Sequence, residues 1–219
     1  PIGNSYPGNS DIDVEMQSCM VFQDPNASSL AVRGMYFIPH ADTSVYDMAG
    51  SEIFVNAYTW DDPWTDIYDA QFDPSASPQV GFDQIGLFAS TTYIPQSNNE
   101  TNTVVYKDFG QQNHFQLVDN QRYLFCVQTF EPADVQFGYD NANDHGANYS
   151  IFGQPNTPLF AGESTPANTW YPSGWSGGPS PSIALRTFDP AELGTYQPTE
   201  MLEGNVFPNP ANDVVNVAV

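Results

Sequence analysis

Two acidic loops carry the side chains best suited to metal chemistry in this chain. Each loop gathers several potential oxygen ligands into one short turn. Ca2+ in proteins takes about six to eight oxygens from carboxylates, amides and backbone carbonyls. Neither loop follows the EF-hand spacing, so the alternative is a pair of solvated turns. We predict Ca2+ as the candidate cofactor, with ligands drawn from Asp61, Asp62, Asp66, Asp140, Asn141, Asn143 and Asp144.

Loop aromatic residues form a second candidate site. Trp60 and Trp64 flank the first acidic turn, and Trp170, Tyr171 and Trp175 crowd a segment rich in Pro and Gly. Exposed tryptophan rings can stack on sugar rings, which would make surface glycans a partner. The alternative is that these rings plug the ends of the fold, because large aromatic side chains bury much area even in loops. Exposure of Trp64 and Trp175 on one concave face would favour ligand binding.

A serine motif invites comparison with hydrolases. Segment 174–178 (Gly-Trp-Ser-Gly-Gly) matches G-x-S-x-G and resembles the nucleophile loop of trypsin-like proteases. A nucleophile elbow needs a strand before the serine and a helix after it, but Pro179 and Pro181 follow Ser176 closely. The trypsin-like loop also has Asp directly before the serine, where this chain has Trp175. We therefore expect a loop here and no nucleophile.

The other catalytic residue types do not form a recognisable set. His40, His114 and His145 are far apart, and no H-E-x-x-H or H-x-H pair exists, which disfavours zinc or copper. Paired carboxylates for glycoside hydrolysis can come from different strands, but no pair stands out among the acidic residues. We expect that the protein is not an enzyme, with a hydrolase as the remaining alternative.

The charge balance excludes some partners. Four Lys and Arg residues stand against twenty-six Asp and Glu, for a net charge of −22 at pH 7. Nucleic acid binding requires clustered cations, and anionic lipid requires a basic patch, so neither is expected. The sequence has no apolar run of about eighteen residues, so we expect no transmembrane segment. No signal peptide is visible, and we read the chain as a mature form.

The two cysteines, Cys19 and Cys126, lie in separate strand-like segments with apolar neighbours. In an oxidising compartment they could pair. A bridge that closes so long a loop contributes about 4–5 kcal/mol in the chain-entropy model. We predict a disulfide between them, and the alternative is two buried free thiols.

These side chains must be positioned by strands, because good helix formers are scarce and nineteen Pro and sixteen Gly interrupt the chain. The runs rich in Val, Phe, Tyr and Thr predict an all-β fold, a β-sandwich that is jelly-roll-like, with a short C-terminal extension. The expected strands are 14–22, 30–38, 52–60, 85–94, 103–109, 115–118 and 122–130, with shorter pieces near 135–139, 148–152 and 182–188. Segment 44–132 resembles jelly-roll modules of secreted Bacteroidota proteins.

The C-terminal segment contains the most specific motif. Residues 204–219 read GNVFPNPANDVVNVAV, a loop followed by alternating apolar and polar residues. This segment closely resembles the opening of the C-terminal sorting domain of the Bacteroidota type IX secretion system. The resemblance covers only the first strand or so, so the chain looks cut inside that domain. It divides the chain into a β-sandwich domain (1–203) and a linker with the start of the sorting domain (204–219). The motif positions are Phe207, Pro208, Asn209, Pro210, Ala211 and Asp213.

The sorting resemblance implies a secreted or outer cell-surface location, with the type IX machinery as a partner. We expect a structural or adhesive protein, a subunit of an extracellular fibre or layer. Strand addition between identical subunits would link such a fibre. The alternative is a carbohydrate-binding or Ca2+-dependent ligand-binding module of a secreted protein.

Overall fold

The structure is a computed structural model. It describes residues 2–3, 14–76, 78–132, 134–140, 145–155, 157–162, 169–174, 180–193, 206–208 and 215–217. These residues form antiparallel sheets, with a single α-helix and short 3-10 turns in the described part of the chain. The prediction of an all-β, sandwich-like fold is confirmed. The jelly-roll strand order stays a prediction.

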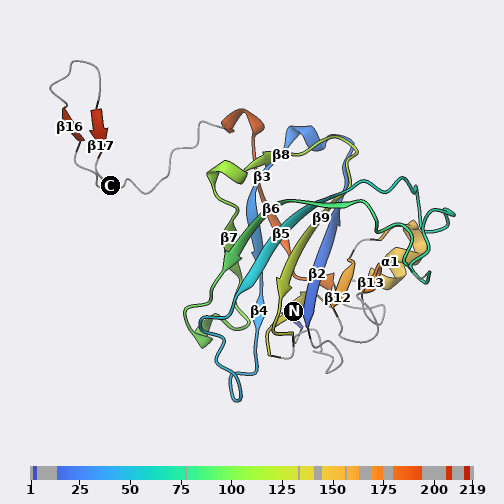
Figure 1. Ribbon diagram of the computed structural model, residues 1–219, viewed down its shortest axis with the longest axis horizontal. Helices are drawn as coiled ribbons and strands as arrows, with labels where there is room; N and C mark the ends of the chain where they lie inside the picture. Colours follow the sequence, from blue (N-terminus) through green and yellow to red (C-terminus); the bar gives the residue numbers. More distant parts are fainter. Residues whose placement is uncertain are drawn as a thin grey trace.

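The larger sheet has six antiparallel strands (Figure 1). Its two central strands are paired along seven registered positions, from Met16 with Thr129 to Phe22 with Tyr123. In spatial order the strands are β13 (Thr169–Tyr171), β12 (Leu159–Gly162), β2 (Glu15–Phe22), β9 (Tyr123–Thr129), β5 (Ile53–Trp60) and β6 (Ile85–Tyr93).

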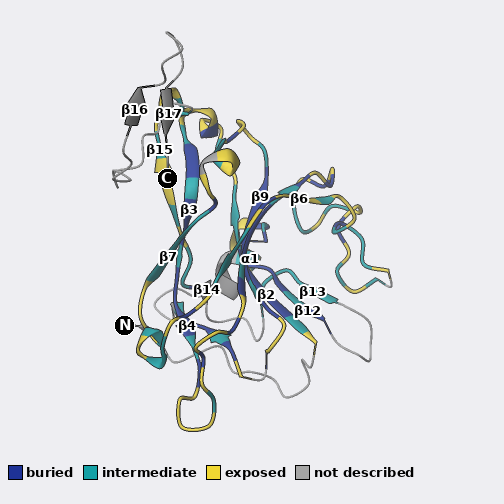
Figure 2. Cartoon of the chain, turned by 60° about the vertical axis from the view of Figure 1, so that its left-hand side comes forward, coloured by how far each residue is buried: buried dark blue, intermediate teal, exposed yellow. Residues whose placement is uncertain are grey.

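The smaller sheet lies in a separate layer, and Figure 2 shows β3 and β7 on one side and β9, β2 and β12 on the other. Its order is β15 (Ala184–Phe188), β3 (Ala31–Phe37) and β7 (Val105–Asp108), and β8 (Phe115–Gln116) also pairs with β3. Short pairs extend the fold: β4 (Pro39–His40) with β10 (Gln136–Phe137), and β11 (Tyr139–Asp140) between β1 (Ile2–Gly3) and β14 (Ser180–Pro181).

The main core fills the space between the two layers. Alternate residues of β9 point into it, because side chains of a strand alternate between faces. Tyr123, Phe125 and Val127 lie in this core with Met35 and Phe37 of β3. The same alternation on β2, β5 and β12 supplies Met16, Ile53, Val55, Ala57, Leu159 and Ala161.

A second, smaller core covers part of the opposite face of the six-stranded sheet. Leu124 and Cys126, which alternate with the core residues of β9, lie there with Cys19 of β2. Segment 61–84, which connects β5 to β6, folds over them and contributes Trp64 and Phe72. Strand β9 is therefore buried on both faces, which explains its nearly continuous apolar sequence.

Glycine is required at position 34, where β3 approaches β7 closely. A Cβ atom on Gly34 would collide with the backbone carbonyl oxygen of Lys107 and with the Cα of Asp108. Backbone cannot move aside as a flexible side chain can, so the residue must lack a Cβ for these strands to pair.

The strand predicted near 148–152 is wrong, because this segment is the last part of helix α1 (His145–Phe152). The run Tyr-Ser-Ile-Phe has strand-forming residues, but Gly153 follows with a φ of 63°. Its N–H donates to the carbonyl of Tyr149 at 3.0 Å, which is the arrangement that ends many helices. Glycine at this position stabilises the end of a helix in a segment whose residue types had predicted a strand.

The C-terminal extension contains two short strands. β16 (Val206–Pro208) pairs antiparallel with β17 (Val215–Val217), with Phe207 opposite Asn216. Among the described strands, neither pairs with a strand of the sandwich. Within the described residues, no helix is long and apolar enough to cross a membrane.

Candidate functional site

The predicted disulfide is confirmed. Cys19 and Cys126 are registered partners on the adjacent central strands β2 and β9, and their sulfur atoms are 2.02 Å apart. Both residues are fully buried beneath segment 61–84. The bond links positions separated by 107 residues. It therefore cross-links the centre of the large sheet.

The two tryptophans of the first acidic loop lie in the second core. Trp60 and Trp64 are 1% and 2% exposed, and their rings meet edge to face at 5.0 Å. Both indole N–H groups donate to the carbonyl of Gly81, at 2.8 and 3.1 Å. Neither ring presents a face to solvent, so in this structure neither can stack on a sugar. Their burial supports the alternative role, which is to anchor segment 61–84.

Arg122 completes this anchor and was not singled out in the sequence. Its guanidinium lies over the Trp64 ring, 3.4 Å from the centroid, and donates to the carbonyls of Trp64 and Asp62 at 3.1 and 3.4 Å. Burial lowers the pKa of Arg122 to about 10, although the charges of Asp62 and Asp61 oppose that shift. A cation on an aromatic face inside the protein ties β9 to the loop.

The carboxylates of the first acidic loop are engaged with protein donors. Asp62 accepts from the Trp60 indole at 3.1 Å and from the backbone N–H of Gln84 at 2.9 Å. Asp61 accepts from the side chains of Thr59 and Gln121, and Asp66 accepts from the backbone of Tyr68. Within the described residues, no group of three or more His, Cys, Asp or Glu is placed to hold a metal ion. These contacts show how the loop is held in its fold.

The second acidic loop lies mostly outside the described residues. Asp140 belongs to β11, where its backbone pairs with Ile2 and Ser180. Asn141, Asn143 and Asp144 are outside the described residues. The calcium hypothesis therefore stays a prediction, and it rests chiefly on this second loop.

The second aromatic group is divided between the two cores. Trp170 is half-buried, stacks on Phe82 at 5.7 Å and is tilted against Phe160 at 5.1 Å. Because Phe82 also stacks on Trp60 at 5.1 Å, the structure joins Trp170 to the cluster of segment 61–84. Tyr171 instead packs against the main core. Trp175 lies outside the described residues.

A polar network crosses four strands on the face of the six-stranded sheet that points away from the main core. Glu15 of β2 accepts from the amides of Gln17, at 2.6 Å, and Gln128, at 2.7 Å. Asn56 of β5 donates to Gln128 at 2.6 Å and accepts from Ser90 of β6 at 2.7 Å. Tyr58 adds a bond to the Gln17 side-chain oxygen at 2.9 Å. Burial raises the pKa of Tyr58 to about 12, with a contribution from the Glu15 charge.

These bonds give the network a direction. The amides of Gln17 and Gln128 donate to Glu15, and the amide of Asn56 donates to Gln128. Gln17 accepts from the Tyr58 hydroxyl, and Asn56 accepts from the Ser90 hydroxyl. One carboxylate therefore orients three amides and two hydroxyls. A satisfied network of this kind fixes the orientation of its groups relative to the sheet. Sequence reasoning missed it, since its members are scattered from position 15 to position 128 and only strand pairing brings them together.

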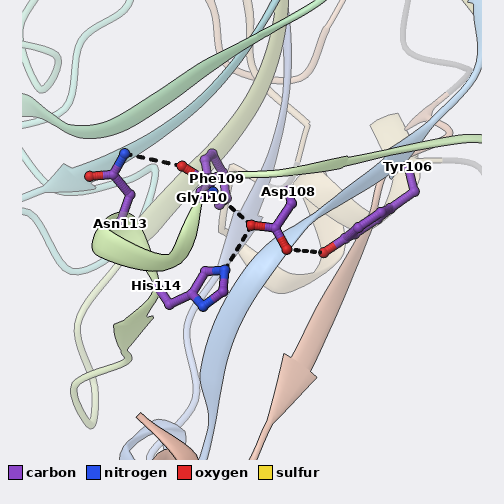
Figure 3. A network of polar contacts seen from close by, with 6 residues as sticks. All are labelled: Tyr106, Asp108, Phe109, Gly110, Asn113 and His114. Atoms are coloured by element: carbon purple, nitrogen blue, oxygen red, sulfur yellow. Dashed lines mark hydrogen bonds and ion pairs between the residues drawn. The ribbon is translucent and has the colours of Figure 1, made fainter. Parts of the chain in front are cut away.

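A second network centres on Asp108 at the end of β7 (Figure 3). Its carboxylate accepts from Tyr106 at 3.0 Å, from His114 Nε2 at 2.7 Å and from the Gly110 backbone at 2.6 Å. Burial raises the pKa of Asp108, but these hydrogen bonds outweigh it and the net shift is downward. The Tyr106 pKa is raised by burial and by the Asp108 charge.

The Asp108 network has the geometry of a structural tie. Both carboxylate oxygens accept protein donors, and His114 has only 4% of its side chain exposed. Asn113 adds a bond to the carbonyl of Phe109 at 3.0 Å, within the 3-10 turn Gln111–Asn113 (Figure 3). The network therefore fastens this turn to β7.

The sorting motif is described only in part. Phe207 and Pro208 lie in β16, and Asn209, Pro210, Ala211 and Asp213 are outside the described residues.

Comparison with known proteins gives no family assignment. No protein-family model matches the chain. Searches of curated proteins and of solved structures also find no match.

Proposed function

We propose that this chain is a secreted or outer-surface structural or adhesive β-sandwich protein, a subunit of an extracellular fibre or layer. The observation that carries the proposal is the buried disulfide between Cys19 and Cys126 at the centre of the large sheet. Disulfides form and persist in oxidising compartments and are rare in the cytosol. A cross-link at this position strengthens a sheet that must persist without chaperones.

Two sequence features support the same location. The net charge of −22 keeps a protein soluble and repels like surfaces, which suits a salty medium that screens the repulsion. The 204–219 segment resembles the start of a type IX sorting domain, so the proposal includes export by that machinery. We propose no catalytic activity for the chain.

The location is tested by expressing the tagged native protein, with and without the sequence from Gly204 onward, in a bacterium with the type IX machinery. Cells with and without an active machinery are fractionated, and the protein is quantified in medium, surface and interior. We expect export only when the machinery is active. Equal retention inside both strains would contradict the proposed route.

Assembly is tested on protein that has already folded and been exported. The tail from Val206 to Val219 is removed by a protease site inserted before it, and particle size is compared before and after cleavage. If identical subunits join by strand addition of the tail, cleavage dissolves the assembly. An assembly that survives unchanged rules out the tail as the joint.

The second candidate function, a ligand-binding module, is favoured by the network around Glu15. Its amides are pre-oriented on a sheet face rather than in the acidic loops, so it provides a binding surface that needs no metal. A monomer that binds a ligand would support this candidate, and a regular polymer without a ligand would support the first.

A further inference from the structure

One row of side chains crosses the entire six-stranded sheet. Phe160 of β12 is the registered partner of Gln17 on β2, Gln17 of Gln128 on β9, and Gln128 of Phe54 on β5. The row continues to the edges through Trp170 on β13 and Thr92 on β6. From Phe160 to Phe54 it spans three strand spacings, or about 14 Å. The row therefore reads aromatic, amide, amide, aromatic over a length that accommodates more than one sugar ring.

The row faces away from the main core. Its members alternate along their strands with Met16, Val127, Ile53 and Leu159, which point into that core. Segment 61–84 covers the neighbouring part of this face and contacts the row at Trp170. Phe54, Gln128 and Phe160 are half-buried, and Phe130, which packs edge to face on Phe54 at 5.5 Å, is 52% exposed. Two aromatic pairs thus flank a central strip of amides.

In the central strip, Gln17 and Asn56 are buried and held in place, and Gln128 is accessible. Gln17 and Asn56 are 8% and 3% exposed and are held by the hydrogen bonds of the Glu15 network. Gln128 is more accessible. It donates one N–H to Glu15 and accepts from Asn56, and within the described residues its second N–H and the Oε2 of Glu15 contact no protein partner. Because their side chains are already held by hydrogen bonds, a ligand would bind these two groups with a smaller loss of side-chain entropy.

The chemistry of the row selects a class of ligand. A sugar hydroxyl can accept from an amide N–H and can donate to a carboxylate, so it suits both groups of the strip. The C–H face of a sugar packs on aromatic rings. An anionic ligand would be repelled by Glu15 and by the net charge of −22. A neutral chain carries neither penalty and can extend along the row.

The geometry points to a binding surface for a neutral polysaccharide, formed by Phe54, Gln128, Phe130 and Phe160 around Glu15. This inference rests on the second candidate function and gives it a site and a ligand class. It places recognition on the sheet face and not on the buried loop tryptophans.

The test uses purified, disulfide-intact protein and measures its depletion from solution by insoluble cellulose, xylan and mannan, with alginate as an anionic comparison. We expect binding to at least one neutral polysaccharide and none to alginate. The variants Phe130→Ala and Gln128→Ala should each weaken binding about tenfold, since each removes one stacking or hydrogen-bonding contact. Phe152→Ala is the matched control, because Phe152 is 71% exposed on α1, outside the row.

Each outcome decides the inference once circular dichroism has shown that the variants are folded. Binding that Phe130→Ala and Gln128→Ala leave unchanged would overturn it, as would the absence of binding to all three neutral polysaccharides. A self-association that Phe130→Ala abolishes, without polysaccharide binding, would assign the row to a second copy of the chain. Because purified protein is used, failure here leaves the proposed export and surface location untouched.

Discussion

The guanidinium carbon of Arg122 lies 3.4 Å from the centroid of the Trp64 ring, between strand β9 and segment 61–84. The same side chain donates to two backbone carbonyls of that segment. One buried cation therefore holds segment 61–84 in place. This segment covers the disulfide and borders the Glu15 network.

Replacing Arg122 by Ala should lower the free energy of unfolding by about 2–4 kcal/mol, because it removes a buried cation–aromatic contact and leaves two buried carbonyls without donors. Urea denaturation measures the loss. Arg186→Ala is the control, since Arg186 is exposed and lies over Tyr106 at 5.2 Å, and it should change stability by less than about 1 kcal/mol. Equal effects of the two substitutions would contradict the role of Arg122.

Removal of the disulfide in a Cys19→Ala, Cys126→Ala double variant should lower the free energy of unfolding by about 4 kcal/mol, since a loop of this length restricts the unfolded chain strongly. Comparing oxidised and reduced wild-type protein in the same denaturation experiment supplies the control. If reduction leaves the wild-type midpoint unchanged, the bond does not stabilise the fold.

The Asp108 network predicts a pH-dependent contribution to stability. A folded carboxyl with a lowered pKa stabilises the protein above its unfolded value of about 3.9, and this contribution is lost as the pH falls through the folded value. Asp108→Asn should therefore lower the free energy of unfolding at pH 7 by about 1 kcal/mol, which will be seen as a lower melting temperature. The difference from wild type should shrink below about pH 4.

Thermal melting at several pH values measures this difference. Asp83→Asn serves as the control for the loss of one negative charge at an exposed position. A deficit of Asp108→Asn that is the same at every pH would show that the tie does not depend on ionisation.

A calcium site in the second acidic loop predicts that a chelator lowers the melting temperature, because a cation bound only to the native state stabilises it. The measurement compares melting with and without chelator at constant ionic strength. The variant Asp144→Asn, in which one proposed ligand is weakened, should reduce the chelator effect. An unchanged melting curve would remove calcium from the account.

Strand positions, but not strand order, could be predicted where aromatic and β-branched residues are frequent over eight or nine positions. The segments expected at 52–60, 85–94 and 122–130 correspond to β5, β6 and β9 within one residue at each end. Local composition is sufficient for β5 and β9 because most of their residues are buried, and for the edge strand β6 because aromatic residues and Thr favour strands. The disulfide was predicted because Cys19 and Cys126 both lie in strand-like segments with apolar neighbours, in the runs that form β2 and β9.

Features that depend on long-range packing were not accessible from the sequence. Strand β12 was not predicted, because it is only four residues long and lies between Pro158 and further turn residues. It is held by four registered pairs with β2 and three with β13. The burial of Trp60 and Trp64 depends on how segment 61–84 folds over the sheet, and no spacing rule reports that. The Glu15 network likewise exists only once β2, β9 and β5 are adjacent.

Immunogold electron microscopy of intact source cells tests the central claim most directly, because it reports location and assembly together. The account predicts label outside the outer membrane, distributed over a regular layer or along fibres. Label confined to the cell interior would contradict it.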